Sequence, residues 1–279
     1  MLNPARDLPL LAALRLRVPG RALRALAAGD TERLRAWLAG ESALRLAEAR
    51  RDARLDFDLL ASMGARIAVP SDDEWPAGFA DLRDPPALLS VRGALPRAGI
   101  AVVGARDADA RACGFARAFA AALRAPIVAG LAPGIDEAAH RGALDAGAPT
   151  VAYVGGGLAR LEDPVLADAI VAGGGAVASE CGPTVAPSAW SRMRRDRLQA
   201  AHARAVVLVV SDAAGGAMHT LRFAREAGRA CFAFASDASG NVLALAAGAR
   251  PLPWDAREAA AAVKAEVDET VSRRGDSVR

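Results

Sequence analysis

Residues 100–140 constrain the fold of this chain more than any other stretch. The apolar run Ile100-Ala101-Val102-Val103 ends at Gly104, and residues 112–123 follow with apolar positions on one helical face. A second apolar run, 126–129, ends at Gly130, and the loop to Gly134 leads into another predicted helix. Two successive strand–glycine loop–helix units are typical of a parallel, doubly wound sheet, whose ligands bind beyond the carboxyl ends of the strands. We therefore expect both glycine loops at one edge of one sheet.

The same alternation continues through most of the chain. Further strands are predicted at 150–154, 176–180, 205–210 and 229–235, and helices at 164–172, 190–202, 215–227 and 241–247. The fold class is therefore α/β: an extended Rossmann-like, doubly wound, mostly parallel sheet over 94–254. A terminal helix is expected from 255 to about 271, and then a polar, disordered tail to 279.

Residues 1–60 carry only short amphipathic patterns and predict a small helical domain. The turn Val18-Pro19-Gly20 is similar to that of a helix-hairpin-helix, whose backbone amides hold a DNA phosphate. Arg21 and Ala22 follow where a second glycine is needed, so a packing turn is favoured over DNA binding. Residues 61–93 contain one short predicted strand, 66–70, and several prolines, which place the stretch at a sheet edge or in a connector rather than in a central strand. It joins the helical domain to the main one.

Composition excludes some classes of protein and leaves others open. The chain of 279 residues is 53% hydrophobic with a net charge of +3, too small to indicate a nucleic-acid partner by itself. Three widely spaced cysteines and three isolated histidines show no metal-ligand spacing, and no apolar run approaches the length of a membrane span. We expect a cytoplasmic protein with reduced thiols, no metal and no membrane association.

Glycine-bearing turns follow four of the predicted strands, at Gly104, at Gly130 with Gly134, at Gly155–Gly157 and at Gly215-Gly216. Backbone N–H groups at such helix starts favour an anion. The spacing is neither G-x-G-x-x-G nor G-x-x-x-x-G-K-S/T, so neither a dinucleotide cofactor nor a P-loop is predicted. The sequence predicts a phosphate or anion site without a cofactor.

The densest basic run is 190–197, which contains Arg192, Arg194, Arg195 and Arg197. A helix carrying them before an apolar strand would lie at the ligand edge, where arginines suit the phosphates of a single strand. A solvated helix face is the alternative. Trp190 could stack on a base, although a packing role is the more common one.

Acid–base groups are few. Asp136 and His140 lie within about one helical turn, and we expect Asp136 to orient the glycine loop and His140 to hydrogen-bond backbone. Glu180 is expected to be structural. No nucleophile–base pair has the usual spacing, so no catalytic residue is predicted and the chain is not expected to be an enzyme.

An ordered set of motifs resembles the DprA/Smf family of bacterial DNA-processing proteins. The set is Val103-Gly104-Ala105-Arg106, Gly130 to Asp136 with Ala139-His140, Ser179-Glu180, Arg195-Asp196-Arg197, Gly216 with Thr220, Gly228-Arg229 with Phe232-Ala233, and Gly248-Ala249. The resemblance covers about residues 5–250. It implies a single-stranded-DNA-binding protein that protects incoming DNA and loads the RecA recombinase in transformation or recombination, as a homodimer.

Carried over by position, the resemblance implies a DNA-phosphate site. It assigns Gly104, Arg106, Gly130, Gly134 and Asp136 to the first two loops, Arg195 and Arg197 to the family's R-N-R motif, and Gly216 with Thr220 to the last turn. We add Arg192 and Arg194 to these on the strength of the basic run.

The sequence departs from the family at several of these positions. Pro133 replaces a usual arginine, Asp196 replaces the asparagine of R-N-R, and Asp163-Pro164 replaces Tyr-Pro. Gly215, Ala217 and His219 stand where Ser, Ser or Thr, and Ile are usual. A winged-helix domain, carried by many members, is not expected after residue 254.

Two other readings stay open. A nucleotide-binding domain, or a LOG-type nucleoside-phosphate hydrolase, would use the same sheet, but the Glu that follows the LOG glycine turn is missing after Thr220. A scaffold that contacts only protein partners is the third reading, which Pro133 and Asp196 favour.

Overall fold

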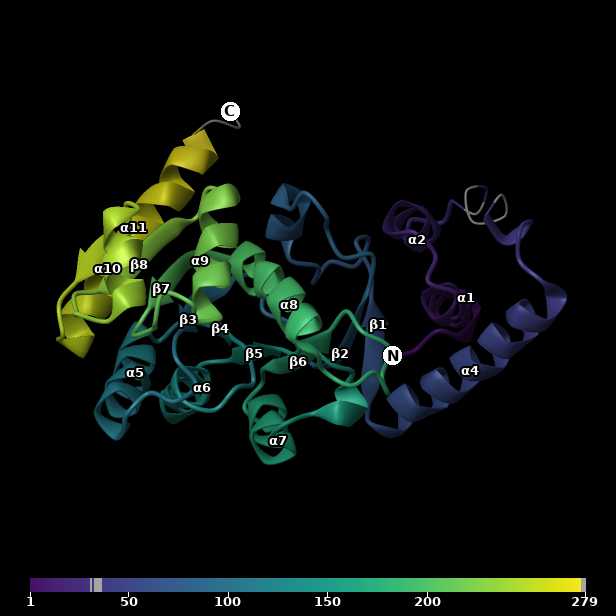
Figure 1. Cartoon of the computed structure of the whole chain (residues 1–279), viewed down its shortest axis with the longest axis horizontal. Helices are drawn as coiled ribbons and strands as arrows, with labels where there is room; N and C mark the ends of the chain where they lie inside the picture. Colours follow the sequence, from purple (N-terminus) through teal and green to yellow (C-terminus); the bar gives the residue numbers. More distant parts are fainter. Residues whose placement is uncertain (31, 33–36, 277–279) are drawn as a thin grey trace.

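The computed structural model describes residues 1–30, 32 and 37–276, and its centre is one nine-stranded sheet (Figure 1). In spatial order the strands are β1 (Ala65–Ala68), β2 (Leu89–Gly93), β6 (Ala176–Ser179), β5 (Thr150–Tyr153), β4 (Ile127–Ala129), β3 (Gly99–Val103), β7 (Ala203–Leu208), β8 (Ala230–Phe234) and β9 (Arg250–Leu252). All neighbours from β6 to β9 are parallel, whereas β2 is antiparallel to β1 and β6. The predicted mostly parallel, doubly wound α/β sheet is confirmed.

Helices cover both faces of this sheet. They are α1 (Pro4–Arg15), α2 (Gly20–Ala27), α4 (Ala43–Ser62), α5 (Ala110–Leu123), α6 (Ile135–Asp145), α7 (Pro164–Ala172), α8 (Ala189–His202), α9 (Ala217–Glu226), α10 (Ser239–Ala246) and α11 (Ala256–Asp276), with short 3₁₀ turns η1 (Ala77–Asp81) and η2 (Leu158–Arg160). Alternate strand residues point to opposite faces. Val206 and Leu208 pack with α8 and α9, whereas Val207 packs with α5, α6 and α11.

Helix α8 carries the basic run, and its start is fixed by its own sequence. The Ser188 hydroxyl accepts from the Ser191 N–H at 3.1 Å, and Ser191 Oγ accepts from the Ser188 N–H at 2.8 Å. This reciprocal capping box satisfies two backbone donors. Leu198 and Ala201 are buried against the sheet, so the helix is anchored along its second half.

Residues 61–93, expected as a connector, supply two strands of the sheet. β1 is the edge strand, but β2 lies between β1 and β6 with Leu89 and Val91 fully buried. The prolines lie outside both strands, so they remove no hydrogen bond from the ladder.

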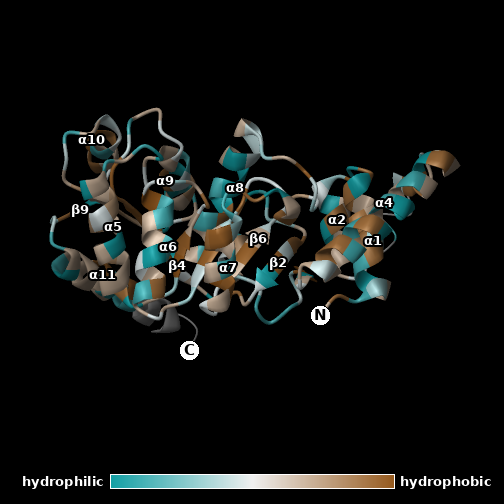
Figure 2. Ribbon diagram, turned by 90° about the horizontal axis from the view of Figure 1, so that it is seen from below, coloured by the Kyte–Doolittle hydropathy of each residue, from teal (hydrophilic) through white to brown (hydrophobic). Residues whose placement is uncertain are grey.

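The helices α1, α2 and α4 gather at the β1 end of the sheet (Figure 2). They share a core with β1 and α7, and Val18, in the turn between α1 and α2, is 6% exposed within it. The burial of Val18 supports the packing role of this turn.

Helix α11 is longer than expected, because it runs to Asp276 and includes the start of the predicted polar tail. A docked helix adds residues at little cost, since each adds a hydrogen bond without new nucleation. Residues 277–279 of that tail lie outside the described part. Within the described residues, no helix combines the length and apolarity that crossing a membrane requires.

Candidate nucleic-acid interface

A pocket lies where the chain changes direction across the sheet. β3 pairs with both β4 and β7; the strands that follow β3 extend to one side and those that follow β7 to the other. The loops after β3 and β7 therefore diverge, which opens a crevice at their carboxyl ends. The resulting cavity has a volume of about 420 Å³.

The structure brings most of the predicted site residues to this pocket. Its lining includes Gly104, Arg106, Asp136, Arg192, Arg195, Gly216 and Thr220, together with Asp107, Asp196, Gln199, Ser211, Asp212 and His219. Gly130 and Gly134 do not line the pocket themselves but lie directly behind residues that do. A Cβ on Gly130 would come within 2.6 Å of Asp136 Oδ2 and still nearer to Arg195, so only glycine lets the loop pass behind these two side chains.

Arg195 is the buried cation of the pocket, 8% exposed. It donates to the carbonyl of Tyr153, and its Nε lies 3.1 Å from Asp196 Oδ1. Burial raises the pKa of Asp136 to about 6 although Arg195, Arg106 and the N–H groups of Gly130 and Ala132 act against it. Burial also raises the pKa of Asp196 to about 7, again against Arg195 and reinforced by the charge of Asp136. The pocket therefore contains two carboxyl groups that are partly protonated near neutral pH.

His140 stabilises the second glycine loop by a hydrogen bond to Gly130. Its ring is fully buried, and burial lowers its pKa to about 4, so the imidazole is neutral. Nε2 lies 2.6 Å from the carbonyl oxygen of Gly130 and Nδ1 lies 2.7 Å from Thr150 Oγ1. In the neutral ring Nε2–H donates to the Gly130 carbonyl, and Nδ1 shares the proton of the Thr150 hydroxyl with the Ile127 carbonyl, to which that hydroxyl donates at 3.0 Å. The expectation that His140 hydrogen-bonds nearby backbone is confirmed.

The four arginines of the basic run do not form one cluster. Arg192 and Arg195 are one helical turn apart and line the pocket, whereas Arg194 and Arg197 face the other side of α8. Arg197 Nη2 donates to Glu180 at 2.6 Å, and Arg194 Nη2 lies 2.8 Å from Asp84 Oδ2. Our sequence interpretation, which placed all four together, missed this division because it counted charge along the chain without the helical period.

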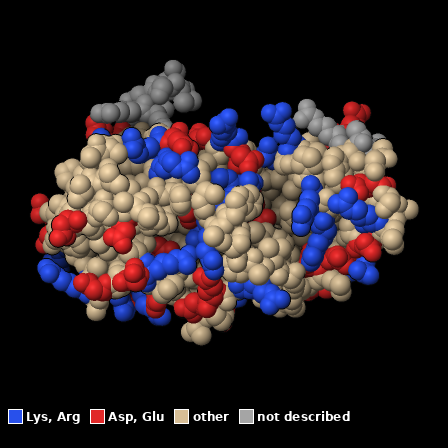
Figure 3. Space-filling view, viewed as in Figure 1, with Lys and Arg blue, Asp and Glu red and all other residues tan. Residues whose placement is uncertain are grey.

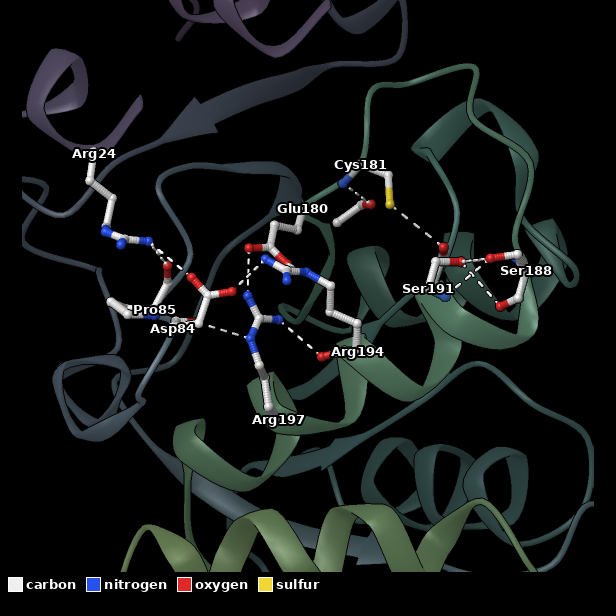
Figure 4. Close-up of polar contacts among 11 residues, drawn as sticks. Arg24, Asp84, Pro85, Glu180, Cys181, Ser188, Ser191, Arg194 and Arg197 are labelled. Atoms are coloured by element: carbon white, nitrogen blue, oxygen red, sulfur yellow. Dashed lines mark hydrogen bonds and ion pairs between the residues drawn. The ribbon is translucent and has the colours of Figure 1, made fainter. Parts of the chain in front are cut away.

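Arg194 and Arg197 belong instead to a polar network that joins three parts of the chain (Figure 4). Arg24 of α2 donates to Asp84 at 3.2 Å and to the carbonyl of Pro85 at 2.8 Å, and Asp84 in turn pairs with Arg194. Glu180, after β6, accepts from Arg197. The contacts of Glu180 support a structural role, and both arginines are already paired with carboxylates.

Arg106 is the most available cation at the mouth of the pocket. It is exposed and donates no hydrogen bond within the described part of the chain. Arg160, which our sequence reasoning did not single out, lines a small extension of the pocket with Arg106 and Arg192. Its position in a short 3₁₀ turn after a glycine-rich loop left no periodic signal.

Ser211, Asp212 and Gln199 also line the pocket without having been predicted. Ser211 and Asp212 follow directly after an apolar strand, which was the available signal. Asn241, fully buried, accepts from the Ser211 N–H at 3.0 Å and donates to the carbonyls of Val209 and Phe234. It thus fixes the ends of β7 and β8 beside the pocket.

Basic and acidic side chains are interspersed over the side of the molecule seen in Figure 3, with no uniformly basic surface there. The pocket lining itself holds three arginines, at 106, 192 and 195, and four aspartates, at 107, 136, 196 and 212. Among the described residues, no three His, Cys, Asp or Glu side chains are placed to hold a metal ion. The pocket is therefore suited to an anion only to the extent that its carboxyl groups carry protons or are already paired.

Two of the predicted site glycines, Gly134 and Gly216, differ in whether their position can accept a side chain. Gly134 has φ +83°, and a Cβ there would lie 2.5 Å from the Ala105 carbonyl oxygen, whereas Gly216 has φ −58° and open space around its Cβ. We expect Gly134→Ala to lower the free energy of unfolding by about 2–4 kcal/mol, from backbone strain and overpacking. Gly216→Ala, the control, is expected to stay within about 0.5 kcal/mol. Urea denaturation of both variants measures this; equal losses would contradict the assignment.

Fold and pocket together define an extended Rossmann-like protein with an arginine- and glycine-lined site at the switch point of its sheet. Residues 66–263 match the sequence profile of the family described as DNA recombination-mediator protein A. The chain belongs to this family, as the ordered motifs indicated.

Curated relatives agree with this. A putative DNA processing protein DprA of Mycobacterium tuberculosis is 37% identical over 197 residues, which are 62% of this chain and 50% of the relative. Protein Smf of Escherichia coli is 33% identical over 175 residues, 59% and 47% of the two chains. This chain therefore spans about half the length of the curated relatives that it matches.

Solved structures show the same fold. DNA processing protein A from Streptococcus pneumoniae superposes with a TM-score of 0.64 at 25% identity, over 88% of this chain and 91% of that one. The Helicobacter pylori protein, described for its single-stranded DNA binding mode, gives 0.63 at 22% identity, over 72% and 96%. At that identity the second likeness shows the fold alone.

Proposed function

We propose that this chain binds single-stranded DNA through the pocket at the switch point, and that it does so without catalysing a reaction. The observation that carries the proposal is that Arg106, Arg192 and Arg195 line one pocket together with Gly216 and Ala217 at the start of α9. Arg106 has no ion-pair partner in the described residues, whereas Arg192 pairs with Glu162 at the surface. Arginine forks and the free N–H groups of a helix start both bind phosphate oxygens. The family membership of the chain supports the same ligand.

The finer parts of the proposal are that the chain protects incoming DNA, loads the RecA recombinase and acts as a homodimer in the cytoplasm. The RecA step rests on family membership. A homodimer is supported by Val242 and Leu243 of α10, two adjacent apolar side chains that are each 51% exposed. The cytoplasmic setting is supported by three free cysteines.

The test is a fluorescence titration with single- and double-stranded oligonucleotides at two salt concentrations. We expect Arg106→Ala to weaken single-strand binding about tenfold and to reduce the salt slope by about one, because one phosphate contact is lost. Arg204→Ala is the matched control: Arg204 is an exposed arginine at the start of β7, the opposite edge of the sheet.

A nucleotide is the competing ligand, since about 420 Å³ is within the range of small-molecule pockets. AMP is therefore a third arm of the titration. Tight AMP binding with salt-independent or absent oligonucleotide binding would replace our proposal with a nucleotide-binding function.

A further inference from the structure

A second, larger cavity lies on the other side of α8. This groove, which we call the α8–α9 groove, has a volume of about 770 Å³. It is lined by residues 81–84 at the end of η1 and after it, by four residues of α8, and by four residues in the second half of α9 and just after it. Those of α8 are Trp190, Met193, Arg194 and Arg197, and those of α9 and its end are Arg222, Phe223, Glu226 and Ala227. Met193 lines both this groove and the pocket at the switch point, so the two cavities adjoin at this residue of α8.

Trp190 is a largely exposed aromatic side chain of the groove. It is 63% exposed, which excludes the packing role considered for it from the sequence. The Arg194 guanidinium carbon lies 5.4 Å from the ring centroid, and Arg194 is itself held by Asp84 and Glu180. An indole held by a fixed cation while most of its surface is open is suited to stack on a second planar group.

Two cations of the groove are available for phosphate. Arg83 is exposed and makes no ion pair within the described residues. In the described part of the chain, the one ion pair of Arg222 is with Glu226, one helical turn away, and both side chains are more than half exposed. Its guanidinium carbon also lies 4.4 Å from the ring centroid of Phe223. A surface ion pair of this kind is weak and easily exchanged for another anion. Asp84 and Asp81, by contrast, are already paired with Arg194 and Arg229.

We infer that the α8–α9 groove is a second subsite for single-stranded nucleic acid, in which Trp190 stacks on an unpaired base while Arg83 and Arg222 contact the flanking phosphates. The inference rests on the proposed function of the pocket, because the strand is expected to reach the groove from there. A stacking subsite takes any base but only an unstacked one. It therefore selects single strands over duplexes, which phosphate contacts alone do not.

The experiment compares a dinucleotide, short enough to occupy the pocket alone, with a 20-nucleotide single strand. We expect Trp190→Ala to weaken binding of the 20-mer about tenfold, and Trp190→Phe to restore it to within about threefold, because phenylalanine keeps a stacking face. Dinucleotide binding is expected to be unchanged in both. Quenching of tryptophan fluorescence by the 20-mer should shrink in Trp190→Phe and persist in Trp254→Phe, the matched control at the opposite end of the sheet.

Each alternative result is decisive. Unchanged 20-mer affinity and quenching in the Trp190 variants would overturn the subsite while leaving the pocket as a DNA site. Equal loss for dinucleotide and 20-mer would also overturn it, because the effect would then lie in the pocket. A wild-type chain that binds neither ligand at either salt concentration would overturn the inference and the proposed function together.

Discussion

Replacing Arg195 with alanine is expected to lower the free energy of unfolding by about 3–5 kcal/mol at pH 8, in addition to abolishing binding at the pocket. Arg195 is 8% exposed and is the cation between Asp136 and Asp196. Its removal leaves the carboxylates of Asp136 and Asp196 without their main counter-charge and the Tyr153 carbonyl without its donor. Urea denaturation monitored by circular dichroism measures the loss.

The size of this loss should depend on pH in a defined direction. The folded-state pKa values of Asp136 and Asp196, about 6 and 7, lie above the unfolded value of 3.8, and they rise further without Arg195. Groups of this kind stabilise the fold below their unfolded pKa and lose that contribution as pH rises through the folded pKa. The deficit of Arg195→Ala should therefore be smallest at pH 4–5 and largest at pH 8. Arg106→Ala is the control, because Arg106 is exposed and acts more weakly than Arg195 on the same two carboxyl groups; it is expected to lose much less stability. A pH-independent deficit in Arg195→Ala would contradict the role assigned to its partners.

The sheet was predictable because its strands are buried on both faces. Runs such as Ile100–Val103 and Ala205–Leu208 are continuously apolar, and glycine turns separate them from helices with a clear period. β2 and β9 were not predicted. β2 ends in Arg92-Gly93 beside prolines, and β9 is three residues long with a proline inside it, so neither carries a local strand signal.

The sequence was sufficient to predict that the glycine loops, Arg106 and Asp136 come together, because loops after parallel strands meet at one edge of a sheet. The helical period could also have divided the basic run, because it separates Arg192 and Arg195 from Arg194 and Arg197. The partners that hold Arg194 and Arg197 could not be predicted, because they lie elsewhere in the chain. Arg194 pairs with Asp84, which is 110 residues away along the chain, and Arg197 pairs with Glu180, which is 17 residues away. Charge counted along the chain contains no information about such partners.

The affinity for single-stranded DNA is expected to increase as pH falls from 8 to 6. The Asp196→Asn variant is expected to bind about tenfold more tightly than the wild type at pH 8 and so to lose most of this pH dependence. At pH 8 the four aspartates of the lining outnumber its three arginines. Protonation of Asp196, with a pKa of about 7, and then of Asp136, with a pKa of about 6, reverses this balance. Two charges about 10 Å apart interact by roughly 1–2 kcal/mol at an effective dielectric constant of about 20, which corresponds to about a tenfold change. Asparagine keeps an oxygen that can accept from Arg195 Nε.

The variant, rather than the pH profile alone, assigns the effect to Asp196, because Asp136 lines the same pocket and its pKa is also raised. The matched control is Asp212→Asn, which removes a negative charge from the same lining but leaves Asp196 in place. It should tighten binding while keeping the pH dependence, whereas Asp196→Asn should tighten binding and flatten it. Titrations with a labelled single strand at pH 6, 7 and 8 and constant ionic strength distinguish the two. If Asp196→Asn retained the full pH dependence, proton uptake would have to be assigned to another group of the pocket, and the carboxyl group of Asp196 would not be what limits phosphate binding there.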